Sequence, residues 1–258
     1  MKNIKNKIAL AVMTTLFTLS TVSPAIAGSV NVSKLRLELD DKKTSDYITL
    51  SNQDTMKSSF ETSVFKWRQK DAYIDKENVI QAENVLTETE DVFISPSTIV
   101  ILPEKSRTLR AIVEDKDKAF QDYSYRIQVK QLDLKEKPVE TNTISLLFNI
   151  TMPLFVLKEP VKEAKNFKLE TSVKNVGNKE VLSIKNLEKQ HIQILSVLLG
   201  KVKTGKIVDG KEEEEEKTVE IIGYILPGVT NMFVLPEAVK GAKVLNIRTD
   251  KGDLTINL

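Results

Sequence analysis

The sequence contains no cysteine and only one histidine, His191. Without cysteine there are no disulfides and no thiolate ligands, so hydrophobic cores must supply the stability of the fold. Metal sites of the usual His/Cys kind need several such ligands, so we expect no metal centre. His191 stands in the strand-like run 190–194, which favours a half-exposed strand residue over a catalytic base.

The sequence also lacks an apolar run long enough to cross a membrane, which takes about 20 residues. The apolar stretch Ile8–Leu19 follows Lys2, Lys5 and Lys7 and precedes a small-residue segment that ends at Ala27. This order is typical of a secretory signal peptide, residues 1–27, that is cleaved after export.

A surplus of positive charge is missing as well. The 258-residue chain has 38 basic and 36 acidic residues, and removal of the three signal lysines leaves 35 against 36. This near-neutral balance argues against a nucleic-acid partner, which would favour a basic face.

Signatures of catalysis are equally scarce. No glycine-rich phosphate loop follows a strand, and no nucleophile elbow or serine–histidine set is evident. The acidic residues around Glu88 and the run Glu212–Glu216 are interpreted as solvated loops, because like charges repel and bury badly. We expect no catalytic residue, no cofactor and no small-molecule substrate.

Period-2 alternation of apolar residues dominates what is present, and it predicts an all-β protein. About seven short strands precede Lys158-Glu159-Pro160, and a second series follows this boundary. The spacing predicts two β-sandwich domains, residues 28–157 and 158–258. The polar stretch 71–78 is expected to form a turn.

The run Ile144–Val156 is the longest alternation, with Ile144, Leu146, Phe148, Ile150 and Met152 on one face. Periodicity alone leaves two interpretations open. The run is either an ordinary core strand or a strand whose surplus apolar side chains are completed by a partner protein through β-augmentation.

Several segments in this order resemble the periplasmic chaperones of the chaperone–usher pathway for pilus assembly. The similar segments are Lys34–Asp40, Ile48–Asn52, Val64–Trp67, Phe93–Pro96, Leu102–Arg110, Leu182–Asn186 and Ile225–Gly228. The resemblance covers the mature chain, is strongest in the first domain, and points to a divergent, archaic branch.

The resemblance implies two immunoglobulin-like domains in an L, and a role in holding pilus subunits that lack their final strand. The chaperone's last first-domain strand fills the open subunit core, so the resemblance assigns Ile144, Leu146, Phe148 and Ile150 as donor residues. It also implies a periplasmic location, delivery of subunits to an outer-membrane usher, and no enzymatic activity.

The family further anchors the subunit's terminal carboxylate with basic side chains from its first and last strands. Arg36 matches the first, but Pro153 stands at the position of the last-strand lysine. We expect another arginine to take that role, with Arg110 as the first candidate and Arg126 as the second. The alternative for each is a surface arginine of its strand, and for Arg126 this alternative is favoured.

Two alternatives remain at this point. The fold is equally compatible with a secreted immunoglobulin-like module that has a structural or adhesive role in a surface fibre. The sequence also leaves open whether the free protein caps its donor strand by forming a dimer.

Overall fold

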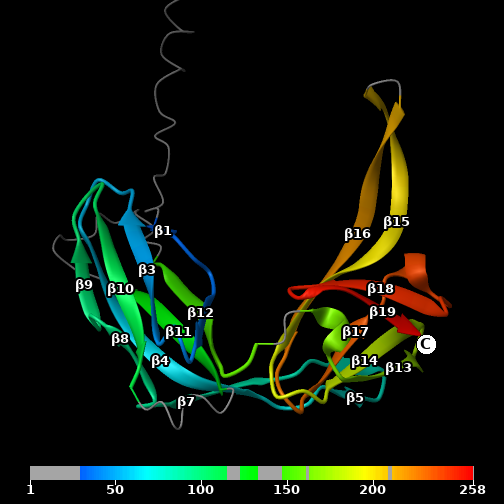
Figure 1. Ribbon diagram of the computed structural model, residues 1–258, viewed down its shortest axis with the longest axis horizontal. Coiled ribbons are helices and arrows are strands. Elements are labelled where there is room, and N and C mark those ends of the chain that lie inside the picture. The colour runs from blue at the N-terminus through cyan, green and yellow to red at the C-terminus, as the bar shows by residue number, and fades with distance from the viewer. Residues whose placement is uncertain (1–29, 115–122, 133–146, 161–162, 209–210, 258) are drawn as a thin grey trace, which may run out of the picture.

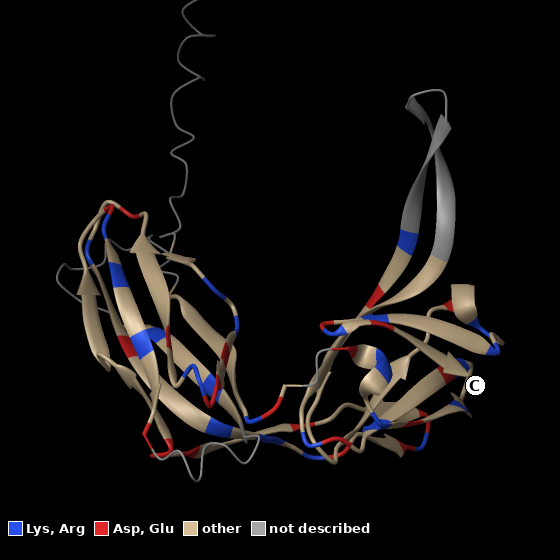
Figure 2. Ribbon diagram, viewed as in Figure 1, with Lys and Arg blue, Asp and Glu red and all other residues tan. Residues whose placement is uncertain are grey.

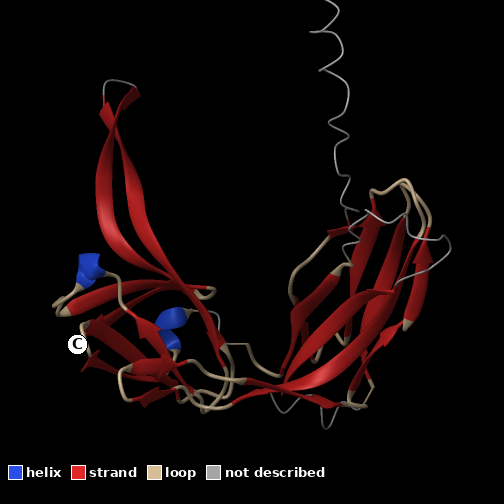
Figure 3. Ribbon diagram, turned by 180° about the vertical axis from the view of Figure 1, so that it is seen from behind, coloured by secondary structure: helices blue, strands red, loops and turns tan. Residues whose placement is uncertain are grey.

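The computed structural model describes residues 30–114, 123–132, 147–160, 163–208 and 211–257, and over 200–216 it describes the backbone alone. The predicted signal peptide and two predicted donor residues, Ile144 and Leu146, lie outside the described residues. The described chain is built from strands, and its helices are two 3-10 turns, η1 at Ala164–Asn166 and η2 at Glu237–Val239 (Figure 3). Among the described residues, no helix is long and apolar enough to cross a membrane.

The first domain is a sandwich of two sheets. One sheet has the strand order β1–β3–β10–β8, and the other has the order β2–β12–β11–β4–β7, with β9 paired to β4. The bounds in the first sheet are Val30–Val32 (β1), Ser45–Asn52 (β3), Ser106–Val113 (β10) and Val92–Ser95 (β8). Those in the second are Leu37–Asp40 (β2), Asn149–Leu157 (β12), Tyr123–Leu132 (β11), Ser58–Gln69 (β4), Asn84–Glu88 (β7) and Thr98–Ile101 (β9).

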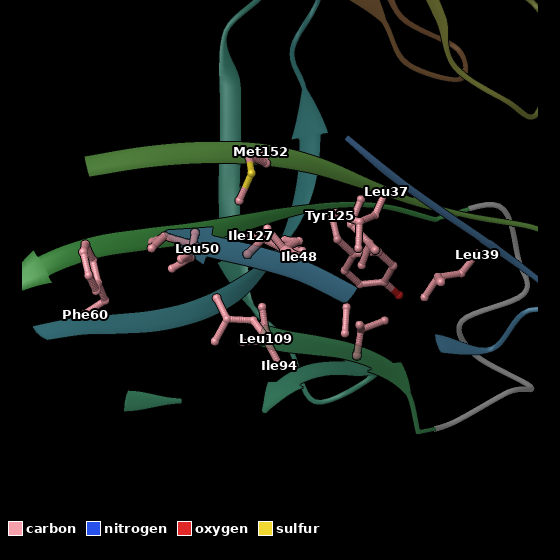
Figure 4. Close-up of a cluster of buried hydrophobic side chains, with 14 of the residues drawn as sticks. Leu37, Leu39, Ile48, Leu50, Phe60, Ile94, Leu109, Tyr125, Ile127 and Met152 are labelled. Atoms are coloured by element: carbon pink, nitrogen blue, oxygen red, sulfur yellow. The ribbon is translucent and has the colours of Figure 1, made fainter. Parts of the chain in front are cut away.

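The core of this sandwich follows the alternation in the sequence. Ile48 and Leu50 of β3, Leu109 of β10 and Ile127 of β11 are fully buried between the sheets (Figure 4). Burial of each such side chain contributes about 1.5–3 kcal/mol, and a core of this size replaces the missing disulfides. The chain crosses between the sheets after β1 and enters the other sheet as β2.

The second domain is also a sandwich. Its three-stranded sheet has the order β13–β14–β17, and its four-stranded sheet has the order β16–β15–β18–β19. The bounds are Leu169–Val176 (β13), Lys179–Asn186 (β14), Thr230–Val234 (β17), Lys211–Ile225 (β16), Ile192–Val208 (β15), Val244–Thr249 (β18) and Gly252–Asn257 (β19). The two-sandwich fold expected from the sequence is therefore the observed one.

The acidic run Glu212–Glu216 was expected in a loop, and this expectation is wrong. It forms the start of β16, which pairs with β15 in a long hairpin that projects from the domain (Figure 1). The register places Glu216 opposite Lys201 and Glu214 opposite Lys203. Residues of opposite charge at facing positions favour strand pairing.

The two sandwiches stand at an angle and meet at one end, which gives the molecule its L shape (Figure 1). Basic and acidic residues are mixed along both domains (Figure 2). The stretch expected as a turn instead forms a hairpin, β5 at Tyr73–Asp75 and β6 at Asn78–Ile80, which reaches the second domain.

This connection between domains is hydrogen-bonded at its base. The side-chain amide of Gln69 donates to the Tyr224 carbonyl at 3.2 Å and accepts from the Leu226 N–H at 3.0 Å. Two residues further on, a carboxylate oxygen of Asp71 accepts from the Thr230 N–H at 2.7 Å. These contacts fix β4 of the first domain to β16 and β17 of the second.

Candidate functional site

Between Asn149 and Pro153, one edge of β12 has no partner strand among the described residues, and we call it the open edge. Antiparallel pairing joins β12 to β11 from Asn149 to Val156, whereas β2 covers the other edge only from Leu154 onward among the described residues. The Gln131 N–H of β11 donates to the Phe148 carbonyl at 2.7 Å. Because alternate residues direct their backbone groups to opposite edges, the N–H groups of Asn149 and Thr151 face the uncovered edge.

The apolar residues beside this edge lie at the margin of the core. Met152 is buried, while Phe148 and Ile150 are partly buried and pack against the same core. The Phe148 ring meets Phe60 edge-on, with centroids 6.3 Å apart. The margin of the core therefore presents apolar side chains that a second sandwich could cover.

Arg36 lies where the open edge ends, because it directly precedes β2. Its guanidinium donates from Nη1 to an Asp250 oxygen of the second domain at 2.7 Å, and from Nη2 to Glu38. The cation also lies 5.1 Å from the centre of the Phe155 ring. Arg36 thus contacts β2 through Glu38, β12 through Phe155 and the second domain through Asp250.

His191 is the third partner of Arg36. Its Nε2 lies 2.8 Å from Nη2 of Arg36, and since arginine only donates, this nitrogen accepts and the ring is neutral. The ring stacks on Phe155 with centroids 3.3 Å apart, and only 1% of the residue is exposed. The expectation of a half-exposed strand residue is wrong, because His191 precedes β15 and fills the joint between the domains.

Burial and charge shape the titration of this cluster. Burial opposes ionisation of Asp250, but the Gln193 N–H and Arg36 lower its pKa to about 2. Burial would lower the pKa of Arg36, yet its two carboxylate partners raise it. All three groups therefore hold their charge state at neutral pH, with Arg36 cationic, Asp250 anionic and His191 neutral.

Three potential metal ligands meet here, which the sequence did not lead us to expect. Oxygen or nitrogen atoms of Glu38, His191 and Asp250 lie within 4.8 Å of one another. The guanidinium of Arg36 contacts all three and already supplies the compensating positive charge. The group is accordingly an ion-pair network centred on arginine.

Arg126 lies on the same side of the sheet as this network. Its guanidinium carbon sits 3.6 Å from the centre of the Trp67 ring and 5.7 Å from that of Tyr224. Burial lowers the pKa of Arg126, and no carboxylate of the described residues forms an ion pair with it. A partly buried cation that stacks on tryptophan without an anionic partner is suited to binding an anion.

Arg110, our first candidate for the second basic residue, lies elsewhere. It belongs to β10 of the opposite sheet, its side chain is exposed, and it donates to Ser45 Oγ at 2.8 Å. Its neighbours Leu109 and Ala111 are buried, so Arg110 faces outward from its sheet. The structure thus brings Arg36 and Arg126 to one region, around Phe155 and Tyr224, and leaves Arg110 apart.

We expect acidification to weaken the folded state through His191. Burial lowers the pKa of His191 below its usual 6.5, so its stabilising contribution is present above about pH 6.5 and is lost as the pH falls below that value. Protonation would set a second cation against Arg36 and near Lys251, relieved in part by Asp250 and Glu38. The free energy of unfolding should fall by at most about 1.4 kcal/mol per pH unit from this group.

Urea unfolding at pH 7.5 and pH 5.5 measures this dependence, with His191→Gln as the comparison. The variant should lose much of the difference between the two pH values. An equal difference in both proteins would show that His191 stays neutral or does not contribute.

The sequence analysis did not identify most of the residues that the second domain contributes to this site. The sequence did not single out Asp250 or Lys251, and nothing in their spacing points to Arg36, which lies 214 positions from Asp250. The signal that could have been used is His191, because a lone histidine beside a strand of buried residues often fills a core. Tyr224 carried no signal of its own.

Comparison with known proteins is consistent with this architecture. Residues 29–160 match the family described as pili and flagellar-assembly chaperone, PapD N-terminal domain. Among curated protein sequences, none matches this chain.

Solved structures show the same fold at low sequence identity. The chaperone CsuC, in complex with the tip adhesion subunit CsuE of archaic Csu pili from Acinetobacter baumannii, is 18% identical with a TM-score of 0.59, covering 88% of this chain and 97% of that one. The SafB chaperone in complex with SafA pilin from Salmonella enterica is 16% identical, with a TM-score of 0.55 and coverage of 89% and 96%. The Escherichia coli chaperone DraB is 16% identical, with a TM-score of 0.53 and coverage of 90% and 98%. With the family match spanning half of the sequence, the chain belongs to the PapD-like pilus-assembly chaperones.

Proposed function

We propose that this protein is a non-enzymatic periplasmic chaperone that binds incomplete pilus subunits by donor-strand complementation and passes them to an outer-membrane usher. The observation that carries the proposal is the open edge of β12 from Asn149 to Pro153. We assign residues 1–27 to the cleaved signal, 28–157 to the donor domain and 158–258 to the second sandwich.

The open edge supplies the backbone half of the interaction. A subunit that lacks its final strand leaves one sheet edge unpaired and part of its core in water, and both are unfavourable. A subunit strand that pairs with the edge of β12 would satisfy the N–H groups of Asn149 and Thr151. Pro153, which has no N–H, ends this stretch, and proline is tolerated on an edge strand.

The side-chain half comes from the apolar face of the strand, for which we propose Ile144, Leu146, Phe148 and Ile150. Phe148 and Ile150 lie at the margin of the first-domain core, so a subunit paired to β12 would continue that core across the interface. Burial of each apolar side chain contributes about 1.5–3 kcal/mol before ordering costs. Several together give a stable but reversible anchor.

A carboxylate at the end of the subunit would meet basic side chains where the open edge ends. We propose Arg36 and Arg126 for this role, with Arg126 replacing Arg110 in our earlier expectation. Arg126 is favoured because it lies beside Trp67 and Tyr224 and has no carboxylate partner among the described residues. A charge-assisted hydrogen bond to such a carboxylate contributes about 1.5–3 kcal/mol.

Alanine substitution separates the two candidate arginines. Arg126→Ala should weaken subunit binding about 10- to 100-fold, because a charge-assisted contact is lost, whereas Arg110→Ala should leave binding unchanged. Affinities measured by surface plasmon resonance at fixed salt distinguish these outcomes. The reverse pattern, with Arg110 required and Arg126 dispensable, would contradict the assignment.

Co-expression with pilus subunits encoded by the same organism, followed by pull-down from the periplasm, tests the proposed function as a whole. We expect a one-to-one complex that protects the subunit from proteolysis. Failure to recover any subunit from the periplasm would instead favour a free-standing immunoglobulin-like module.

A further inference from the structure

Arg36 is not a free cation in this structure. One of its terminal nitrogens donates to Asp250, and the other contacts Glu38 and His191. Only 22% of its side chain is exposed. A carboxylate that arrives from outside therefore finds both terminal nitrogens of Arg36 already in contact with the protein's own acceptors.

Asp250 makes the contact that an external carboxylate would make. One oxygen accepts from Arg36 at 2.7 Å, and the other accepts from the Gln193 N–H at 2.9 Å, so the second domain holds the group in place. Its side chain is 9% exposed. Asp250 thus places a carboxylate of the second domain against Arg36 of the first domain.

The local charge is balanced. Arg36 and Lys251 contribute two positive charges, and Glu38 and Asp250 contribute two negative ones. A further carboxylate gains little attraction from Arg36 while both acids remain, because at these separations like charges offset the attraction. Loss of Asp250 from Arg36 would restore one net positive charge.

Asp250 can leave Arg36 without becoming unsatisfied. Its second oxygen keeps the Gln193 N–H, and Lys251 Nζ already lies 3.9 Å from the first. Glu38 differs because it lies in β2, two residues from Arg36, and reaches the second domain only through Lys251 Nζ at 3.6 Å, so its release would leave the Arg36–Asp250 contact in place. Exchange at Asp250 is therefore the step that couples anion binding to the contact between domains.

We propose that Asp250 is an internal stand-in for the ligand carboxylate, occupying Arg36 in the free chaperone and giving way when a partner's terminal carboxylate binds. This inference rests on the proposed role of Arg36 as a carboxylate anchor. It adds that Asp250 of the second domain occupies Arg36 until a partner's carboxylate displaces Asp250. Subunit capture would therefore weaken the Arg36–Asp250 ion pair between the domains.

Acetate serves as the probe, because it presents a carboxylate and needs no identified subunit. The Arg36 side-chain resonance, assigned by its loss in Arg36→Ala, is followed by NMR during titration with sodium acetate against sodium chloride at equal ionic strength. In the signal-free chain, Asp250→Asn should bind acetate at Arg36 at least about tenfold more tightly than the unmodified protein. The asparagine keeps an oxygen for the Gln193 N–H, and a thermal melt verifies the fold.

Glu38→Gln is the matched comparison, since it also removes one acid from the network but leaves the Arg36–Asp250 contact between the domains in place. Equal acetate affinity in Asp250→Asn and the unmodified protein, or tightening in Glu38→Gln alone, would overturn the inference. Subunit capture by Arg36→Ala is scored separately. Normal capture by Arg36→Ala would show that Arg36 is not the anchor, whatever the acetate titration gives. If Arg36→Ala loses capture but Asp250→Asn binds acetate no more tightly than the unmodified protein, Arg36 remains the anchor and only the exchange with Asp250 is excluded.

Discussion

Replacing Phe148 with aspartate should abolish the capture of pilus subunits. Phe148 lies at the margin of the first-domain core, on the face that we propose to enter the subunit. The change removes about 1.5–3 kcal/mol of apolar burial and places a charge where the subunit core would close over it. Pull-down yield should fall below detection, and affinity by surface plasmon resonance should drop at least about 1000-fold.

Thr151→Asp is the matched control for this variant. Thr151 lies in the same strand but on its exposed face, so the same charge there should be far less harmful. Thermal melts of both variants verify that the sandwich stays folded, because Phe148 also contacts Phe60. Normal capture by a folded Phe148→Asp variant would exclude donation of this strand.

Arg36→Ala is expected to have the second largest effect. It removes the proposed carboxylate anchor and also leaves Asp250 and Glu38 without their main cation in the joint between the domains. Loss of one partner of a partly buried charge pair costs about 3–5 kcal/mol when the remaining charge is buried. Subunit affinity should fall at least about 100-fold, with a measurable loss of stability in urea.

Arg248→Ala is the comparison for that effect. Arg248 also pairs with an acid, Asp253 at 3.2 Å, but on an exposed surface of the second domain. Exposed pairs contribute about 0–1 kcal/mol, so this variant should bind subunits normally. If both variants captured subunits equally well, Arg36 would be a structural residue of the domain joint and not an anchor.

The sandwich strands could be predicted because their alternation reflects burial. In β3, Ile48 and Leu50 face the core, and Tyr47 before them is exposed, as a period of two requires. The same alternation of buried and outward-facing residues runs through β10. Arg36 could be placed beside the last strand because the family motif carries it there.

The joint between the domains could not be read from the sequence. His191, Asp250 and Tyr224 acquire their roles by contact with Arg36 and Phe155, residues of another domain, and periodicity reports only local geometry. The β5–β6 hairpin was missed for the same reason, since its polar residues look like a turn until the second domain pairs with its base. The run Glu212–Glu216 was wrongly assigned to a loop, because charge predicts exposure to solvent and not backbone conformation.

Arg126 and Arg110 illustrate a further limit. Both occupy outward-facing positions in strands, so their patterns do not distinguish them. The two arginines differ in the side chains around them. Arg126 lies against Trp67 and against Tyr224 of the second domain. Such a difference depends on domain orientation, which one sequence does not reveal.

Hydrogen–deuterium exchange of the chaperone, free and with a captured subunit, tests strand donation most directly. We predict that the amides of Asn149 and Thr151, which face the uncovered edge, exchange at least about 100-fold more slowly in the complex. Protection confined to other surfaces, such as the outer face of β3 and β10, with unchanged exchange along β12, would contradict the account.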